Sequence, residues 1–109
     1  MVRTIASSPG QPIPERVQEV ALLAAAAVRE ELGPGARVVW FGSWPRGQAR
    51  PRSDLDLGVE RDPAISPGEL AKARERLEDL PTLYSVDLVD LGEAGPTLRE
   101  EVEREGMAL

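Results

Sequence analysis

The stretch that decides the fold covers residues 42–57 and reads GSWPRGQARPRSDLDL. It starts with Gly42 and Ser43, directly after the apolar run VVWF at 38–41. A short continuous apolar run of this kind is typical of a strand buried on both faces. The sequence DLDLGV at 54–59 alternates polar and apolar residues, which predicts a second, half-buried strand. We therefore expect two neighbouring strands joined by a polar, arginine-rich loop.

Two carboxylates mark the beginning of the second strand. Asp54 and Asp56 are two positions apart, so in a strand their side chains point to the same face. Carboxylates held side by side repel each other unless a cation lies between them, and Mg²⁺ prefers such hard oxygen ligands. Two metal ions about 4 Å apart would hold the attacking and leaving oxygens of a phosphoryl-type displacement. The pair therefore predicts a two-metal site that binds a polyphosphate.

The Gly-Ser pair predicts an anion site at the other end of the loop. Gly42 allows a sharp turn and the close approach of a ligand. If a short helix starts at Ser43, its free backbone N–H groups and the serine hydroxyl can bind an anion. Arg46 is within reach of the same anion, although a plain surface arginine is an equal alternative. Residues 37–61 carry five arginines and three acids, a charge of +2, within a chain of net charge −6.

A third carboxylate would complete the metal site. Asp87 belongs to an otherwise apolar segment, SVDLV at 85–89, within a strand that we expect over 83–91. Burying a lone carboxylate is costly without a partner or a metal. Asp90 is the rival, but it lies nearer the end of the strand, where a solvated acid needs no explanation. We therefore predict Asp87 as the third ligand.

The rest of the chain predicts a single small domain. Apolar residues recur with helical spacing from Pro14 until the Gly-Pro-Gly sequence at 33–35. Ser66 and Glu69 form a capping box that starts a second helix, ending near residue 80. Pro96 opens a last short helix. The order predicts an α/β (α+β) fold, a small mixed β-sheet with helices mainly on one face, over residues 13–109 after a flexible leader at 1–12.

Composition excludes several kinds of chemistry. The chain has 109 residues, no His and no Cys. This rules out disulfides, thiolate zinc sites, histidine bases and imidazole metal ligands. No apolar stretch approaches the ~20 residues of a membrane span, and the N-terminus does not have the order of regions of a signal peptide. We expect a cytoplasmic protein without a membrane partner, and the acidic balance makes nucleic acid an unlikely partner.

Together, these motifs resemble a known family. Gly42-Ser43, Arg46-Gly47 and the sequence SDLDL at 53–57 are similar to the signature of the minimal nucleotidyltransferases of the DNA polymerase β-like superfamily. The resemblance extends from about residue 14 to residue 109. It implies a nucleotidyltransferase fold like the palm of polymerase β. Trp44-Pro45 departs from the family pattern, which has a more usual residue followed by a small one.

The resemblance also implies roles for single residues. In the family, the pair corresponding to Asp54 and Asp56 binds both Mg²⁺ ions. The acid corresponding to Asp87 binds the ion that activates the attacking hydroxyl. The residues corresponding to Gly42 and Ser43 hold the triphosphate of the nucleotide, with ATP as the expected substrate here.

Family members often pair with a HEPN-domain ribonuclease toxin and act as its antitoxin, and some transfer AMP from ATP to a tyrosine of the toxin. We therefore expect a Mg²⁺-dependent nucleotidyltransferase, here a protein adenylyltransferase, that modifies a hydroxyl of such a partner. Two alternatives stay open: an antitoxin that acts by binding alone, and a transferase with a small-molecule acceptor. Both homo- and hetero-oligomers are compatible with the sequence.

Several residues near the motifs have two interpretations. Trp44 either packs locally or stacks on a nucleobase, and local packing is favoured. Arg50 and Arg52 are solvated loop residues or contacts to a partner. The acidic segment at 100–105 is a solvated helix face or a partner-binding surface.

Overall fold

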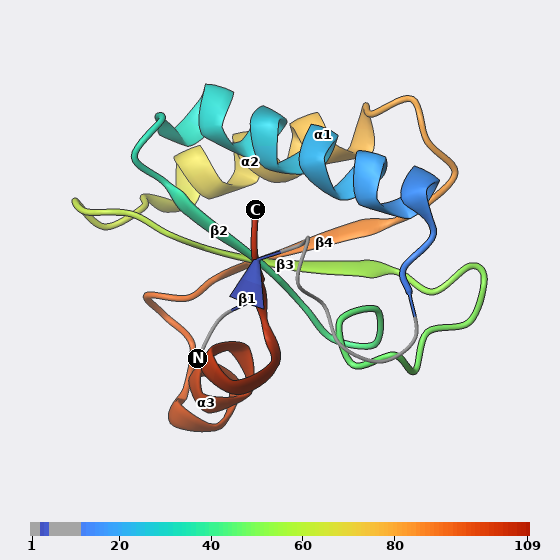
Figure 1. Ribbon diagram of the computed structural model, residues 1–109. Helices are drawn as coiled ribbons and strands as arrows, with labels where there is room; N and C mark the ends of the chain where they lie inside the picture. The colour runs from blue at the N-terminus through green and yellow to red at the C-terminus, as the bar shows by residue number, and fades with distance from the viewer. Residues whose placement is uncertain (1–2, 5–11) are drawn as a thin grey trace.

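The computed structural model describes residues 3–4 and 12–109 and contains a five-stranded sheet with helices on both faces (Figure 1). The order of strands across the sheet is β1-β5-β2-β3-β4. The elements along the chain are β1 (Arg3–Thr4), α1 (Glu15–Leu32), β2 (Arg37–Phe41), β3 (Leu55–Glu60), α2 (Pro67–Glu78), β4 (Val86–Asp90), α3 (Pro96–Glu105) and β5 (Met107–Ala108).

The central strands fix the register of the sheet. Strands β2 and β3 run antiparallel, with Phe41 opposite Asp56. Strand β4 lies parallel to β3, because the chain crosses over through α2, as a parallel connection requires. In this register Asp56 is the direct neighbour of Asp87. The sheet is therefore mixed, as predicted.

The core has two parts, one on each face of the sheet. Helices α1 and α2 cover one face (Figure 1), where the fully buried Leu55 and Leu57 belong to the larger apolar cluster. Helix α3 covers the other face with a smaller cluster around Val39 and Val102. The prediction of helices mainly on one face is confirmed. In the described part of the chain, no helix is long and apolar enough to cross a membrane.

The structure differs from the predicted strands in two places. The strand expected over 83–91 is shorter, since residues 81–84 form bends and Leu83 is 98% exposed. Strands β1 and β5 were not expected, because two residues are too few to show a period. The predicted leader at 1–12 includes β1, which pairs with β5. Residues 1–2 and 5–11 of the leader lie outside the described residues. The leader therefore stays a prediction.

The start of α2 is held by two polar networks. Ser66 and Glu69 form the predicted capping box. The guanidinium of Arg61 also donates to both oxygens of Glu69, at 2.6 and 2.8 Å. A further hydrogen bond from Arg61 reaches the carbonyl of Leu32, so the end of α1 is tied to the same network.

We expect Glu69→Gln to make the unfolding free energy less dependent on pH in the acid range. The hydrogen bond from Arg61 is the main cause that lowers the pKa of Glu69 to about 2. A lowered pKa stabilises the fold above the ordinary pKa of about 4.3, and this contribution disappears as the pH falls toward 2. Urea unfolding at pH 7, 5 and 3 should therefore show a smaller loss of unfolding free energy in the variant than in the wild type. Glu75→Gln, on the exposed surface of α2, is the control; equal losses in all three proteins would contradict the account.

Candidate active site

Strand pairing brings the three predicted carboxylates to one face of the sheet. Leu55 and Leu57 point into the core below α1 and α2, so Asp54 and Asp56 point to the opposite face, the one that carries α3. Asp87 is the register neighbour of Asp56 in the parallel strand β4 and shares its face. The site lies where β3 and β4 begin.

The alternation of faces also separates Asp87 from its rival Asp90. Asp90 is three positions further along β4, so its side chain points to the other face. Its carboxylate accepts a hydrogen bond from the backbone N–H of Gly92 at 2.9 Å and so stabilises the turn after the strand. The expectation that Asp87 is buried is wrong, because β4 is an edge strand and its side chain is exposed. What Asp87 adds is its place beside Asp56.

Mutual repulsion characterises this group of acids. The pKa of the half-buried Asp56 is raised, first by burial and then by the negative charges of Asp87, Asp54 and Glu101, while Arg46 opposes the shift. Such a group of like charges, made of hard oxygen donors, fits a divalent cation. Among residues 3–4 and 12–109, no three acidic side chains already enclose a point where a metal ion fits. The carboxylates would therefore have to turn toward each other to share an ion.

Gly42 connects the Gly-Ser turn directly to Asp56. Its φ of +85° is in the left-handed region that favours glycine. A Cβ at this position would lie 2.3 Å from Oδ2 of Asp56. The turn and the carboxylate therefore touch, and no side chain fits between them.

The turn after Gly42 is closed by its own backbone. The N–H of Arg46 donates to the carbonyl of Gly42 at 3.3 Å, and that of Gln48 donates to the carbonyl of Ser43 at 2.9 Å. Residues 43–47 form turns and not the short helix that the sequence suggested. Within the described chain, the N–H groups of Ser43 and Trp44 have no hydrogen-bond acceptor. These two donors and the Ser43 hydroxyl are available to an anion.

Arg46 is held by two acids that the sequence analysis did not assign to the site. Its Nη1 lies 3.8 Å from Oε1 of Glu101, and its Nε lies 3.7 Å from Oε2 of Glu105. Both acids belong to α3, and their separation by four residues places them on one side of that helix. The four-residue spacing of Glu101 and Glu105 could have been noticed in the sequence. Only the packing of α3 on the sheet, however, shows that the helix side carrying both acids faces Arg46.

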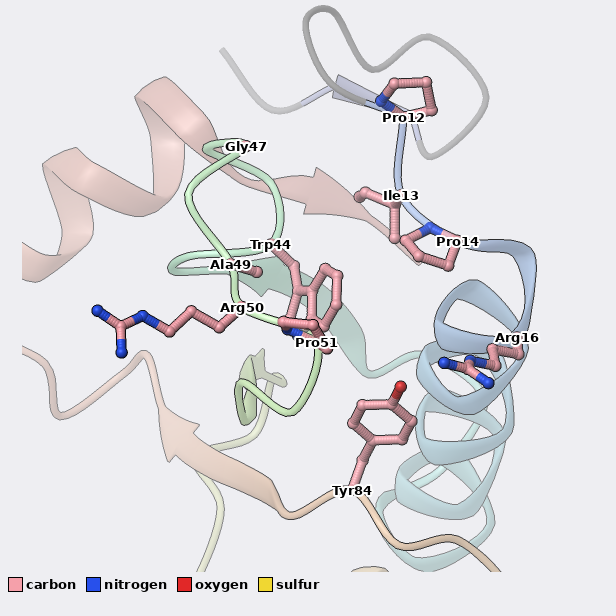
Figure 2. Close-up of a pocket in the computed structure, with 10 residues that line it drawn as sticks. All are labelled: Pro12, Ile13, Pro14, Arg16, Trp44, Gly47, Ala49, Arg50, Pro51 and Tyr84. Carbon is pink, nitrogen blue, oxygen red and sulfur yellow. The ribbon is translucent and has the colours of Figure 1, made fainter.

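Trp44 packs locally, as the sequence analysis favoured. Its side chain is 7% exposed and belongs to the larger core cluster. The indole Nε1–H donates to the carbonyl of Ser53 at 2.9 Å. The ring meets Tyr84 edge-on, with 6.4 Å between the ring centres (Figure 2). Trp44 therefore holds the loop before Asp54 against the core.

We expect Trp44→Phe to lower the unfolding free energy by about 1–2 kcal/mol, because the half-buried carbonyl of Ser53 loses its donor. Since the ring packs locally, the affinity for ATP should change less than about twofold. Chemical denaturation and titration calorimetry measure the two quantities. Tyr84→Phe retains the ring contact and serves as the control. A large loss of ATP affinity with unchanged stability would show that Trp44 contacts the nucleotide.

A mixed sheet with acids at the start of β3 and β4 and a Gly-Ser turn beside them defines the nucleotidyltransferase class of fold. A family profile described as polymerase beta, nucleotidyltransferase matches residues 36–109. The chain thus belongs to the polymerase β-like nucleotidyltransferase family. A comparison with curated protein sequences gives no match.

Solved structures agree with this assignment. The structure of a candidate minimal nucleotidyltransferase is 34% identical over 84% of this chain and 94% of that chain, with a TM-score of 0.66. A toxin-antitoxin structure with AMP-PNP is 23% identical over 79% of this chain and 69% of that chain, with a TM-score of 0.64. A complex of tri-AMPylated Shewanella oneidensis HEPN toxin with MNT antitoxin is 22% identical over 84% of this chain and 69% of that chain, with a TM-score of 0.62. At these lower identities, the last two show the shared fold.

Proposed function

We propose that this protein is a Mg²⁺-dependent nucleotidyltransferase that moves AMP from ATP to a tyrosine hydroxyl of a HEPN-domain toxin and thereby acts as its antitoxin. The proposal depends above all on one observation, the placement of Asp56 between Asp87 in the next strand and the backbone of Gly42. The same fold occurs in a complex with an AMPylated HEPN toxin and in a toxin-antitoxin structure with AMP-PNP, which supports the choice of nucleotide and partner.

The residues of the site have separate tasks in this reaction. Asp54, Asp56 and Asp87 would hold Mg²⁺, which supplies positive charge that acidifies the attacking hydroxyl and offsets the charge of the polyphosphate. The N–H groups of Ser43 and Trp44, with the Ser43 hydroxyl, bind phosphate oxygens of the nucleotide.

The hydroxyl oxygen attacks the α-phosphorus, the bond from this phosphorus to the bridging oxygen breaks, and pyrophosphate leaves. Asp87, exposed at the sheet edge, is placed to accept the hydroxyl proton. Arg46 can stabilise the leaving group once a phosphate replaces Glu101 and Glu105 as its partner.

The surface of the site favours a macromolecular acceptor over a small molecule. Two pockets of about 310 and 550 Å³ adjoin Tyr84, and neither is lined by Asp54, Asp56 or Asp87. A small acceptor would need an enclosing wall beside the carboxylates. The exposed edge at Asp87 instead suits a hydroxyl presented by another protein.

Labelled ATP tests the proposal. A HEPN-domain protein, the partner class proposed above, is incubated with the chain, Mg²⁺ and ATP labelled at either the α- or the γ-phosphate. We expect the α-label, and not the γ-label, to appear on the partner, and the Asp54→Ala/Asp56→Ala variant to transfer none. Equal labelling of the partner by this variant would contradict the proposed catalytic function. If the variant still relieves toxicity in cells, the antitoxin acts by binding alone.

A further inference from the structure

The arginines of this protein divide into two groups. Most of those with described side chains donate to, or form an ion pair with, a carboxylate or a backbone carbonyl: Arg29, Arg37, Arg46, Arg61, Arg74, Arg76, Arg99 and Arg104. The others, Arg16, Arg50 and Arg52, have no side-chain partner within the described residues. All three line one of the two pockets beside Tyr84. Among the described residues, the arginines without a side-chain partner are therefore concentrated in one place.

The two pockets adjoin each other, and we call them together the α1 groove. They share Arg16, Pro51 and Tyr84, and their other lining residues come from the segment at 12–14, the first half of α1 and the loops at 44–52 and 81–84. Figure 2 shows the end that contains Trp44 and Tyr84, with Arg16 on the side of α1. The side chain of Arg50 runs away from the rings (Figure 2). Arg16 and Arg52 are thus the arginines that we consider available to a ligand bound in the groove.

Apolar side chains lie open to solvent at the other end of the groove. Leu83 is 98% exposed and Leu23 is 44% exposed, and both line the wider pocket. Glu19 is the acid among the residues that line this pocket. Exposed leucines and unpaired arginines thus line the same pocket, and such a mixture of apolar and basic side chains suits binding to another protein.

We propose that the α1 groove docks an acidic segment of the partner protein, one whose carboxylates pair with Arg16 and Arg52 and whose apolar side chains cover Leu23 and Leu83. The proposal rests on the proposed function, since it assigns the surface that recognises the protein acceptor. Charge complementarity selects an acidic ligand. The exposed leucines favour a polypeptide over a nucleic acid, and the ring of Trp44 is too buried to stack on bases.

The position of the groove fits a role in presenting the acceptor hydroxyl. Arg52 is two residues before Asp54, and Tyr84 is three residues before Asp87. The N–H of Leu55 donates to the carbonyl of Ser85 at 2.9 Å, which holds the two loops together where β3 and β4 begin. The groove therefore lies at the end of the sheet where the carboxylates stand, and docking a partner there raises the effective concentration of its hydroxyl near the site.

Two matched pairs of variants test the groove. The affinity of the full chain for the HEPN-domain partner used in the transfer assay is measured by biolayer interferometry at about 150 mM salt. We expect Leu23→Asp to raise Kd at least about tenfold, whereas Leu22→Asp, on the same helix at 49% exposure but outside the groove, changes it less than about twofold. Likewise, Arg52→Glu should weaken binding at least about tenfold, whereas Lys72→Glu, an exposed cation of α2 outside both pockets, should not.

The outcomes separate this proposal from the function on which it rests. Three results would contradict docking in the α1 groove. They are equal effects of Leu23→Asp and Leu22→Asp, unchanged binding by both groove variants, and no binding of the partner by the wild-type chain. Circular dichroism confirms that each variant is folded. If the groove variants lose binding while the wild-type complex transfers no AMP, the docking proposal holds and the proposed transferase function is wrong. If AMP is transferred equally by all variants, the transferase stands and the groove fails.

Discussion

We expect the replacement of Asp56 with asparagine to lower AMP transfer about 1000-fold and, at the same time, to stabilise the metal-free protein. The loss follows because asparagine has the shape of aspartate but not the charge that holds a divalent cation between Asp54 and Asp87. A loss of about 4 kcal/mol of transition-state stabilisation corresponds to a roughly 1000-fold lower kcat/KM. Quenched-flow measurement of AMP transfer to the HEPN partner detects a change of this size.

The gain in stability has a separate cause. Burial and the charges of Asp87 and Asp54 raise the pKa of Asp56. A carboxyl with a raised pKa stabilises the fold when protonated, and this contribution is lost as the pH rises through its folded pKa. At pH 7 the ionised carboxylate therefore lowers the unfolding free energy, and asparagine removes this destabilisation. Thermal unfolding in the presence of EDTA should show a higher Tm for the variant.

Asp90→Asn is the matched control for this experiment. Asp90 lies on the other face of β4, and asparagine can still accept the hydrogen bond from Gly92. Its activity should stay within about threefold of the wild type, since it is outside the proposed site. An Asp56→Asn variant with normal activity, or with a lower Tm than the wild type in EDTA, would contradict the roles assigned to these acids.

Gly42→Ala is expected to damage both the fold and the activity. At a φ of +85°, alanine costs about 1–2 kcal/mol of backbone strain. Its Cβ would also fall 2.3 Å from Oδ2 of Asp56, so the carboxylate must move. A displacement of about 1 Å near reacting groups can reduce the rate about 100-fold. Urea denaturation and the transfer assay measure the two effects.

A double-mutant cycle separates strain from the steric contact. In an Asp56→Ala background the clashing oxygen is absent, so Gly42→Ala should cost less unfolding free energy than it does in the wild type. Gly35→Ala is the control, because a Cβ at Gly35 meets no atom within 4 Å. If the cost of Gly42→Ala is the same in both backgrounds, the turn does not act through Asp56.

Local sequence patterns predicted the parts of the fold that are built by neighbouring residues. The capping box at Ser66, the helical period of α1 and the alternation after Asp54 each leave a signal within one turn or one strand. The shared face of Asp54 and Asp56 follows from the strand period alone.

Features that depend on tertiary contacts were not predictable in this way. The two-residue strands β1 and β5 exist only because they pair with each other and because β5 also pairs with β2. Hydrophobicity suggested a strand through Leu83, but β4 begins only at Val86, where pairing with Leu55 starts. The contacts of Arg46 with Glu101 and Glu105 join segments more than fifty residues apart, and no local pattern reveals such a pair.

The most direct test of the central claim is to locate the metal ions and the nucleotide. Crystals of the protein are grown with Mn²⁺ and a non-hydrolysable ATP analogue, and anomalous scattering places the ions. We predict Mn²⁺ within about 2.2 Å of oxygens of Asp54, Asp56 and Asp87, with the triphosphate on the N–H groups of Ser43 and Trp44. Mn²⁺ bound elsewhere, with the three carboxylates free of metal while the nucleotide is present, would contradict the account.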